Sequence, residues 1–252
     1  MRGLKGKRVI VTGGGSGIGA ATSRRFGKEG AHVLIFDIDI KSARQTAQEI
    51  ATSGGQADAF EVDITDRDTV SAAVSEIGSN GIDALVNNVG WDRLVPFVDS
   101  DTELWTKVID INLYGPLHMH HAVLPVMIAQ RHGRVVNIAS DAGRVGSTGE
   151  AVYSACKGGI IAFTKTMARE LARTGVQLNA VCPGPTETPL FASFAEGGSG
   201  ERIKAALEKA IPMGRLARPD DFPGIICFLA SDDAGFITGQ TISVSGGLTM
   251  SG

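Results

Sequence analysis

Three side chains that could move a proton to or from an alcohol oxygen lie close together in the sequence. Tyr153 and Lys157 are one turn apart in a segment that predicts a helix, so both side chains share one face. Ser140 ends an apolar run at residues 134–139 that predicts a strand, and a glycine-rich loop joins it to the helix. A phenol, an ammonium and a hydroxyl in this arrangement predict acid–base chemistry on an alcohol without a metal.

The energy that this chemistry requires can be compared with what one neighbouring charge supplies. A free tyrosine has a pKa of about 10, whereas a general base works best near the operating pH. Lowering that pKa by about three units takes about 4 kcal/mol, which an ammonium about 4 Å away supplies at an effective dielectric constant of about 20. We therefore expect Lys157 to lower the pKa of Tyr153, and Ser140 to hold the substrate oxygen. The same pair would also fit an ordinary helix contact, so the rest of the chain must decide.

A glycine-rich loop near the N-terminus predicts a phosphate site. Residues 9–11 form a short apolar run typical of a buried parallel strand, and a helical pattern follows the loop as far as Gly30. Backbone N–H groups and the helix dipole face an anion in such a strand, loop and helix unit, and missing Cβ atoms let it approach. The residues expected to form this cradle are Gly13, Ser16, Gly17, Ile18 and Gly19.

An acidic residue at the end of the second predicted strand favours one cofactor. Asp37 follows the glycines by about 20 residues, where a carboxylate accepts hydrogen bonds from the adenosine ribose and repels a 2′-phosphate. Positions 16 and 38, where an arginine could bind such a phosphate, hold Ser16 and Ile38 instead. The pattern therefore predicts NAD rather than NADP. The alternative is that Asp37 is a solvated acid that caps the next helix.

The later predicted strands also end in polar or small residues. Asp63 and Ile64 would border the adenine, although Asp63 could equally be a plain acid at a strand end. Asn88 and Gly90 fit the ligand crevice at the carboxyl end of an open α/β sheet. The loop after the sixth strand would present threonine hydroxyls to a carboxamide through Pro183, Gly184, Thr186 and Thr188.

Two further segments carry specific expectations. A long helical region is predicted over residues 102–131, with bends expected at Pro116 and Pro125. Asn112 lies inside it, and because asparagine is a poor mid-helix residue we expect a local reason for its presence. Residues 190–210, with a glycine-rich hinge at residues 197–200, predict a mobile substrate lid or, alternatively, a surface loop.

Composition excludes several other classes of protein. The 252-residue chain has a formal net charge of −3 and no basic patch, so no nucleic-acid partner is expected, and no apolar run suggests a membrane partner. The three cysteines lack metal-ligand spacing and favour a reducing cytoplasm, and Cys156 is expected to be a packed thiol. His118 and His121 could share a helix face, but no carboxylate or cysteine completes a metal site.

Together, these residues resemble the short-chain dehydrogenase/reductase family over essentially the whole chain. The glycine loop, the run Asn87-Asn88-Val89-Gly90, and Asn112, Ser140, Tyr153 and Lys157 have the family's order and spacing, with Val89 where the family usually has alanine. The resemblance implies one domain over residues 1–252, an α/β Rossmann fold. Its doubly wound, seven-stranded parallel sheet would have the order 3-2-1-4-5-6-7, with helices on both faces, and the chain would assemble as a homotetramer.

The resemblance also implies residue roles. Tyr153 would be the acid and base, Lys157 would lower its pKa and hold the ribose, and Ser140 would orient the substrate oxygen. Asn112 would support a water in the proton relay, and Thr188 would contact the nicotinamide amide.

Within the family, four runs resemble the dehydrogenases of 2-hydroxycyclohexanecarboxyl-CoA, which act in alicyclic and aromatic acid degradation. The runs are residues 87–92, 117–125, 140–157 and 231–250. This small-molecule substrate would contact Trp91, Arg144, Ser147 and Glu150, and Arg93, Arg144 and Arg202 are candidates for binding the CoA phosphates. Three alternatives remain: a dehydrogenase of free cyclic, steroid or aryl alcohols, an NADPH-dependent 3-oxoacyl thioester reductase, and a nucleotide sensor without turnover.

Overall fold

Seven parallel strands form one sheet in the computed structural model, which describes residues 1–194 and 200–250. The strand order is β3-β2-β1-β4-β5-β6-β7. The predicted Rossmann fold and its strand order are therefore confirmed. The strands are β1 (Arg8–Thr12), β2 (His32–Asp37), β3 (Gln56–Glu61), β4 (Ala84–Asn87), β5 (Gly133–Ile138), β6 (Val176–Pro183) and β7 (Thr241–Val244).

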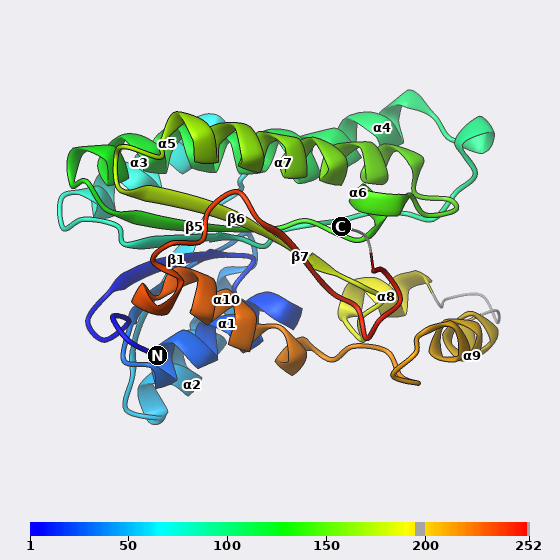
Figure 1. Cartoon of the computed structure of the whole chain (residues 1–252), viewed down its shortest axis with the longest axis horizontal. Helices are drawn as coiled ribbons and strands as arrows, with labels where there is room; N and C mark the ends of the chain where they lie inside the picture. Colours follow the sequence, from blue (N-terminus) through cyan, green and yellow to red (C-terminus); the bar gives the residue numbers. More distant parts are fainter. Residues whose placement is uncertain (195–199, 251–252) are drawn as a thin grey trace.

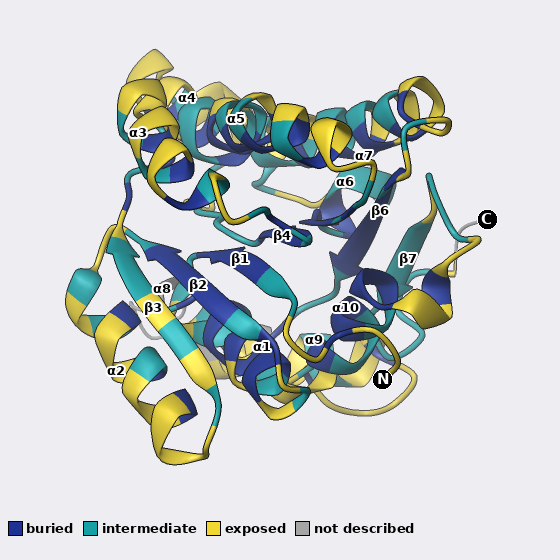
Figure 2. Ribbon diagram, turned by 90° about the vertical axis from the view of Figure 1, so that its left-hand side faces the viewer, coloured by how far each residue is buried: buried dark blue, intermediate teal, exposed yellow. Residues whose placement is uncertain are grey.

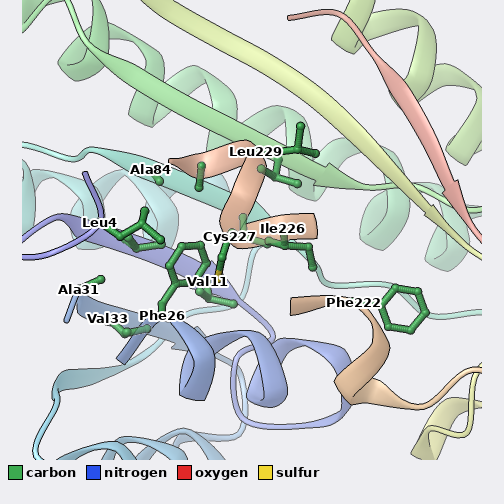
Figure 3. Packing of buried hydrophobic residues seen from close by; sticks show 14 of the residues in the cluster. Leu4, Val11, Phe26, Ala31, Val33, Ala84, Phe222, Ile226, Cys227 and Leu229 are labelled. Carbon is green, nitrogen blue, oxygen red and sulfur yellow. The ribbon is translucent and has the colours of Figure 1, made fainter. Parts of the chain in front are cut away.

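Apolar side chains alternate between the two faces of the sheet and explain the continuously apolar strands. In β1, Val9 and Val11 belong to one hydrophobic cluster and Ile10 to the other, and all three are fully buried. Figure 3 shows Val11 in the first cluster with Phe26 and Ile226, which come from the helices covering that face. A strand with helices on both sides has no solvent-facing side, which is why its sequence shows no polar alternation.

Helices cover the sheet in two layers (Figure 1). One layer contains α1 (Gly17–Lys28), α2 (Ile40–Thr52) and α10 (Pro223–Ala230). The other contains α3 (Arg67–Gly78), α4 (Thr102–Ile109), α5 (Gly115–Ala129) and α7 (Ala151–Glu170). Of the described helices, none combines the length and hydropathy needed to cross a membrane.

Burial differs between the central and the edge strands of the sheet (Figure 2). β1 and β2 are buried along nearly their whole length, whereas β3 at the edge has no fully buried residue. The order of connections places a crevice in the buried centre, because the chain runs outward from β1 to β3 and then returns to β4 on the other side of β1. Ligands of open α/β sheets bind at the carboxyl ends of strands at such a switch point.

Helical structure runs from Thr102 to Ala129, which confirms the predicted long helical region. A π-helix, η2 (Asp110–Tyr114), separates α4 from α5, and Asn112 lies at its centre. Pro116 lies in the first turn of α5, where a proline needs no hydrogen-bond partner for its nitrogen, and Pro125 lies inside α5. A π-helical turn within a longer helix often marks a functional site. Here the turn contains Asn112, the residue that the sequence analysis noted as unusual inside a helix.

Candidate active site

A cavity of about 1420 Å³ opens at the carboxyl end of the sheet. It follows the ends of β1, β2, β4, β5 and β6 and continues to α8 (Pro189–Phe194) and α9 (Gly200–Ala210). Ser140, Tyr153 and Lys157 line it together, although Ser140 comes from the end of β5 and the other two from α7. The wall of this one cavity therefore includes both the glycine loop and the predicted catalytic residues.

The glycine loop has the backbone geometry that the phosphate cradle requires. Gly13 and Gly17 have φ angles of +62° and +50°, a region that side chains disfavour, and Gly17 begins α1. Gly19 is the one predicted cradle residue that does not line the cavity. A Cβ there would overlap the carbonyl oxygen of Gly13 and lie 2.6 Å from the amide nitrogen of Asn88. Gly19 therefore lets α1 pack directly against the loop.

Asp37 is held at the cavity wall by two backbone N–H groups. Gly15 N donates to one carboxylate oxygen at 2.9 Å, and Asp39 N donates to the other at 3.0 Å. The cap of α2 is Asp39 instead, whose side chain accepts from Lys41 N at 3.0 Å. The alternative reading of Asp37 as the helix cap is therefore wrong.

The adenine side of the cavity contains the predicted acid at the third strand end. Asp63 and Ile64 both line the cavity. One Asp63 oxygen accepts from the backbone nitrogen and the hydroxyl of Thr65, at 2.8 and 2.7 Å. The helix that follows is capped by Asp66, so Asp63 is a turn residue at the cavity wall.

Asn88 joins the ends of β1 and β4 beneath the cavity. Its side-chain nitrogen donates to the carbonyl oxygens of Thr12 and Gly13, at 3.1 and 3.3 Å. Its backbone nitrogen donates to the Thr12 hydroxyl at 3.0 Å. Gly90 follows, and a Cβ there would lie 3.4 Å from Lys157 Nζ and 3.3 Å from Asn112 Oδ1. The small residue thus lets the ammonium approach this strand end.

The loop after β6 completes the predicted cofactor wall. Pro183, Gly184, Thr186 and Thr188 all line the cavity. The Thr186 hydroxyl donates to Gly184 O at 2.7 Å, and the Thr188 hydroxyl accepts from Phe191 N at 3.2 Å. Thr188 therefore fixes the start of α8 beside the cavity.

Lys157 is buried, and its ammonium has a defined direction. Nζ donates to Ile138 O at 3.0 Å and lies 5.5 Å from the centre of the Tyr153 ring. Burial lowers the pKa of Lys157 to about 8. The lysine is thus oriented by the end of β5 as well as by its own helix.

The Tyr153 phenol is neutral in the environment that the side chains create. Burial is the main cause that raises its pKa, and the Glu150 carboxylate raises it further, whereas Ser140 acts in the opposite direction. The expected lowering by Lys157 is not what these side chains produce on balance. Desolvation of a buried phenolate outweighs an ammonium that lies beside the ring and bonds to a carbonyl.

Asn112 binds the loop that follows β4. Its side-chain nitrogen donates to Trp91 O at 2.6 Å and to Val108 O at 2.9 Å, and its oxygen accepts from Trp91 N at 3.3 Å. The side chain is fully buried. These bonds are the local reason for an asparagine in the helix. A role in supporting a relay water stays a prediction.

Three of the four predicted substrate residues line the cavity: Trp91, Ser147 and Glu150. Arg144 does not, and its guanidinium donates to the Ser243 hydroxyl at 2.7 Å. The side chain turns toward β7, and a contact of Arg144 with substrate stays a prediction. Arg93 and Arg202 are exposed and also lie outside the cavity wall.

The predicted site did not include five charged residues that line the cavity: Asp92, Glu103, Lys107, Asp110 and Asp141. Asp92 is buried in the loop after β4, and Lys107 lies 3.9 Å from the centre of the Trp91 ring. The signal for Asp92 was an acid directly after an aromatic residue at a strand's carboxyl end. Lys107 lies in α4, just before the π-helix. The sequence pattern of the helical region did not show which side of α4 would be turned toward the cavity.

The histidines and cysteines have structural partners. His118 bonds to Ile64 O at 3.0 Å and His120 to Pro116 O at 2.6 Å, and Cys156 is a buried free thiol. Within residues 1–194 and 200–250, no group of three or more histidine, cysteine, aspartate or glutamate side chains could hold a metal ion.

The predicted lid segment contributes to the cavity through both of its helices. Leu190 and Phe191 from α8 and Leu207 from α9 line the wall. Of the predicted hinge, Gly200 begins α9, whereas Gly197, Gly198 and Ser199 lie outside the described residues. Closure of this segment stays a prediction.

A family model described as enoyl-(acyl carrier protein) reductase matches residues 13–249. The chain belongs to the short-chain dehydrogenase/reductase family. It is therefore an enzyme of an oxidoreductase family that uses a nicotinamide dinucleotide, and the glycine loop, Asp37 and the predicted catalytic side chains of the cavity fit that group.

Curated relatives act on several kinds of substrate. The chain is 39% identical to a 3-oxoacyl-[acyl-carrier-protein] reductase of Thermotoga maritima, over 98% of this chain and 99% of that protein. It is 40% identical to galactitol 2-dehydrogenase of Agrobacterium fabrum, with 98% and 99% covered. It is 36% identical to a subunit of (2S)-[(R)-hydroxy(phenyl)methyl]succinyl-CoA dehydrogenase of Thauera aromatica, with 98% of each chain covered.

Solved structures of similar proteins include both cofactors. Actinorhodin polyketide ketoreductase with NADPH has a TM-score of 0.92 at 35% identity, covering 98% of this chain and 99% of that one. A 3-oxoacyl-[acyl-carrier protein] reductase of Brucella melitensis with bound NAD has a TM-score of 0.90 at 32% identity, with 98% and 92% covered. The resemblance to 2-hydroxycyclohexanecarboxyl-CoA dehydrogenases is not tested by these relatives and stays a prediction.

Proposed function

We propose that this protein is an NAD-dependent dehydrogenase that oxidises a secondary alcohol to a ketone. The observation that carries the proposal is one cavity lined both by Ser140, Tyr153 and Lys157 and by a fixed carboxylate at Asp37. The first group of residues suits proton transfer at an alcohol oxygen, and the carboxylate suits an unphosphorylated ribose.

The residues divide the chemistry in the following way. The Ser140 hydroxyl holds the alcohol oxygen. Tyr153 reacts as the phenolate, a form that the positive charge of the oxidised cofactor would favour, and its Oη accepts the alcohol proton as the carbonyl forms. Lys157 balances the negative charge of the phenolate, and its bond to Ile138 O keeps the ammonium next to the ring. A bound nicotinamide supplies the hydride acceptor and, in its oxidised form, a positive charge that favours the phenolate.

The substrate that we propose is a cyclic 2-hydroxyacyl-CoA such as 2-hydroxycyclohexanecarboxyl-CoA, as in alicyclic and aromatic acid degradation. Support comes from relatives whose names specify thioesters with an oxygen function on the acyl chain, the Thermotoga reductase and the Thauera dehydrogenase. The large, partly apolar cavity, with Trp91, Leu94 and Leu190 in its wall, suits a ring. We further propose that the protein works in the cytoplasm as a homotetramer.

A 3-oxoacyl thioester reductase is a second candidate, and the 39% identity to the Thermotoga reductase favours it to the same degree. It would run the same proton transfer in the opposite direction. The Asp37 carboxylate disfavours it where NADPH is the reductant, because a 2′-phosphate would meet a negative charge.

The test is a set of initial rates with purified protein. We expect NADH formation from NAD with 2-hydroxycyclohexanecarboxyl-CoA, a lower rate with NADP, and little turnover of the free acid or of galactitol. Faster oxidation of NADPH by a 3-oxoacyl thioester than reduction of NAD by the hydroxyacyl thioester would favour the reductase. Activity restricted to free alcohols would reject both thioester functions.

A further inference from the structure

Two acidic side chains face the substrate end of the cavity. Asp92 lies in the loop after β4, and Glu150 precedes the first turn of α7, the helix that carries Tyr153. Asp92 is 5% exposed, and its Oδ2 atom is buried without a hydrogen-bond partner among the described residues. Burying a carboxyl oxygen without a hydrogen-bond partner lowers the stability of the folded protein, and such atoms are rare. A ligand in the cavity that bonds to the carboxyl group would explain it.

The charges around this pair do not neutralise it. Within residues 1–194 and 200–250, no ion pair joins Asp92 or Glu150 to a cationic side chain. From α7, the pKa values of Tyr153 and Cys156 are both raised by the Asp92 charge, and the Glu150 charge, next to the start of α7, acts on Asp92. From α4, the Lys107 ammonium lies over the Trp91 ring, and Asp92 is not among its ion-pair partners.

Burial favours the protonated form of both acids. Burial, helped by the Glu150 charge, raises the pKa of Asp92 to about 7. Burial also raises the pKa of Glu150, although a hydrogen bond from Ser147 opposes the change. A carboxyl group whose pKa is raised to about 7 keeps its proton below that pH, and the protonated group both donates and accepts hydrogen bonds.

We propose that Asp92 and Glu150 form a subsite that binds a neutral carbonyl group next to the reacting carbinol and excludes a free carboxylate there. The proposal rests on the proposed function, because a 2-hydroxyacyl thioester places its carbonyl beside the carbinol carbon. In its protonated form, the Asp92 carboxyl group, whose Oδ2 has no protein partner, donates a hydrogen bond to that carbonyl oxygen. A substrate carboxylate in the same place would have no cation to meet and would repel the pair.

The probes are three cyclic alcohols that differ only in the neighbouring group. They are methyl 2-hydroxycyclohexanecarboxylate, its free acid, and cyclohexanol, which lacks a second polar group. Each is measured with wild-type protein, Asp92→Asn, Asp92→Ala and Glu150→Gln, at saturating NAD. The exposed Asp99 lies outside the cavity wall, so Asp99→Asn is the matched control for loss of one acidic charge.

We expect wild-type protein to prefer the ester over the free acid by about 10²-fold in kcat/KM. Asp92→Ala should raise the KM for the ester about tenfold, with kcat and the rate with cyclohexanol little changed. Asp92→Asn keeps a donor, so its KM for the ester should stay within about threefold, and its use of the free acid should improve. Glu150→Gln should improve use of the free acid in the same way, and Asp99→Asn should change nothing.

Dependence on pH gives a second readout. In wild-type protein the KM for the ester should rise above about pH 7 as Asp92 ionises, and in Asp92→Asn it should stay flat over the same range. Equal use of ester and free acid by wild-type protein would overturn the proposal. So would an Asp92→Asn variant that loses the ester as completely as Asp92→Ala does, since the charged carboxylate would then be required.

These outcomes separate the subsite from the proposed function. If the CoA thioester is inactive but the ester shows the Asp92-dependent KM, the CoA function fails and the subsite stands. If the CoA thioester is oxidised and neither Asp92 variant changes its KM, the function stands and the subsite fails.

Discussion

The carboxamide of Asn112 holds the backbone of Trp91 from both sides, donating to its carbonyl oxygen at 2.6 Å and accepting from its nitrogen at 3.3 Å. The π-helical turn that breaks the long helix places this side chain under the loop after β4. The loop in turn carries Asp92 and the indole ring into the cavity wall. Asn112 thus connects the π-helix η2 to the loop after β4 that forms part of the cavity wall.

Replacement of Asn112 should therefore affect the substrate wall as well as catalysis. Asn112→Ala leaves two backbone groups of Trp91 without their partner and should lower stability by about 1–3 kcal/mol. We expect the KM for the substrate to rise while the Kd for NAD changes little. Urea unfolding and separate titrations of cofactor and substrate measure these quantities. An unchanged KM with only kcat reduced would assign Asn112 to the proton relay alone.

Removal of the Tyr153 hydroxyl should abolish most turnover. Tyr153→Phe keeps the ring in place but removes the group that accepts the proton, so we expect kcat to fall by about 10²-fold or more. The Kd for NAD, measured by quenching of tryptophan fluorescence, should stay within a few-fold of wild type. A variant that retains a near wild-type rate would contradict the role of Tyr153.

Asp37 should control the choice between the two cofactors. A hydrogen bond to a charged acceptor contributes about 1.5–3 kcal/mol, so Asp37→Ala should raise the KM for NAD by about 10- to 100-fold. The KM for NADP should fall or stay level because the repulsive carboxylate is gone. Initial rates with each cofactor give the ratio, and an unchanged ratio would remove Asp37 from the ribose site. Asp39→Ala, which loses only the helix cap, is the control for stability.

Gly19 should be intolerant of any side chain although it lies inside a helix. In Gly19→Ala the added Cβ would overlap Gly13 O, so the phosphate loop must shift. We expect loss of NAD binding by at least tenfold. Gly224→Ala in α10 is the matched control, because a Cβ there meets nothing within 4 Å. Equal NAD affinity in the two variants would show that the loop accommodates the added group.

Asp92 should make the stability of the protein depend on pH. Its usual pKa of 3.8 is raised to about 7 in the folded chain, mainly by burial. Between these values the folded chain keeps a proton that the unfolded chain has released, so stability falls as pH rises from about 4 to 7. Asp92→Asn lacks this loss.

The Tm difference between Asp92→Asn and wild type should therefore grow from pH 4 to pH 7 and level off above it. The exposed Asp99→Asn variant is the control and should show no such growth. A constant Tm difference across this range would mean that Asp92 does not titrate as its burial implies.

The fold and the side chains that line the cavity could be predicted from the sequence. Continuous apolar runs such as residues 9–11 and 135–136 have one physical solution, strands covered on both faces, and the glycines at their ends fix the turns. These signals are local and predicted the strands and the side chains at their ends that line the cavity, whereas the strand order came from the resemblance to the family.

Tertiary structure alone decided what depends on contacts between distant segments. Arg144 was close in sequence to Ser140 but turns to Ser243 on β7, a partner that no local pattern could name. Asp92 and Glu150 are far apart in sequence, and only the fold places both in one cavity wall and buries Asp92. The same burial raises the pKa of Tyr153 against the expected effect of Lys157. Desolvation depends on every atom around a group, and no spacing rule contains that information.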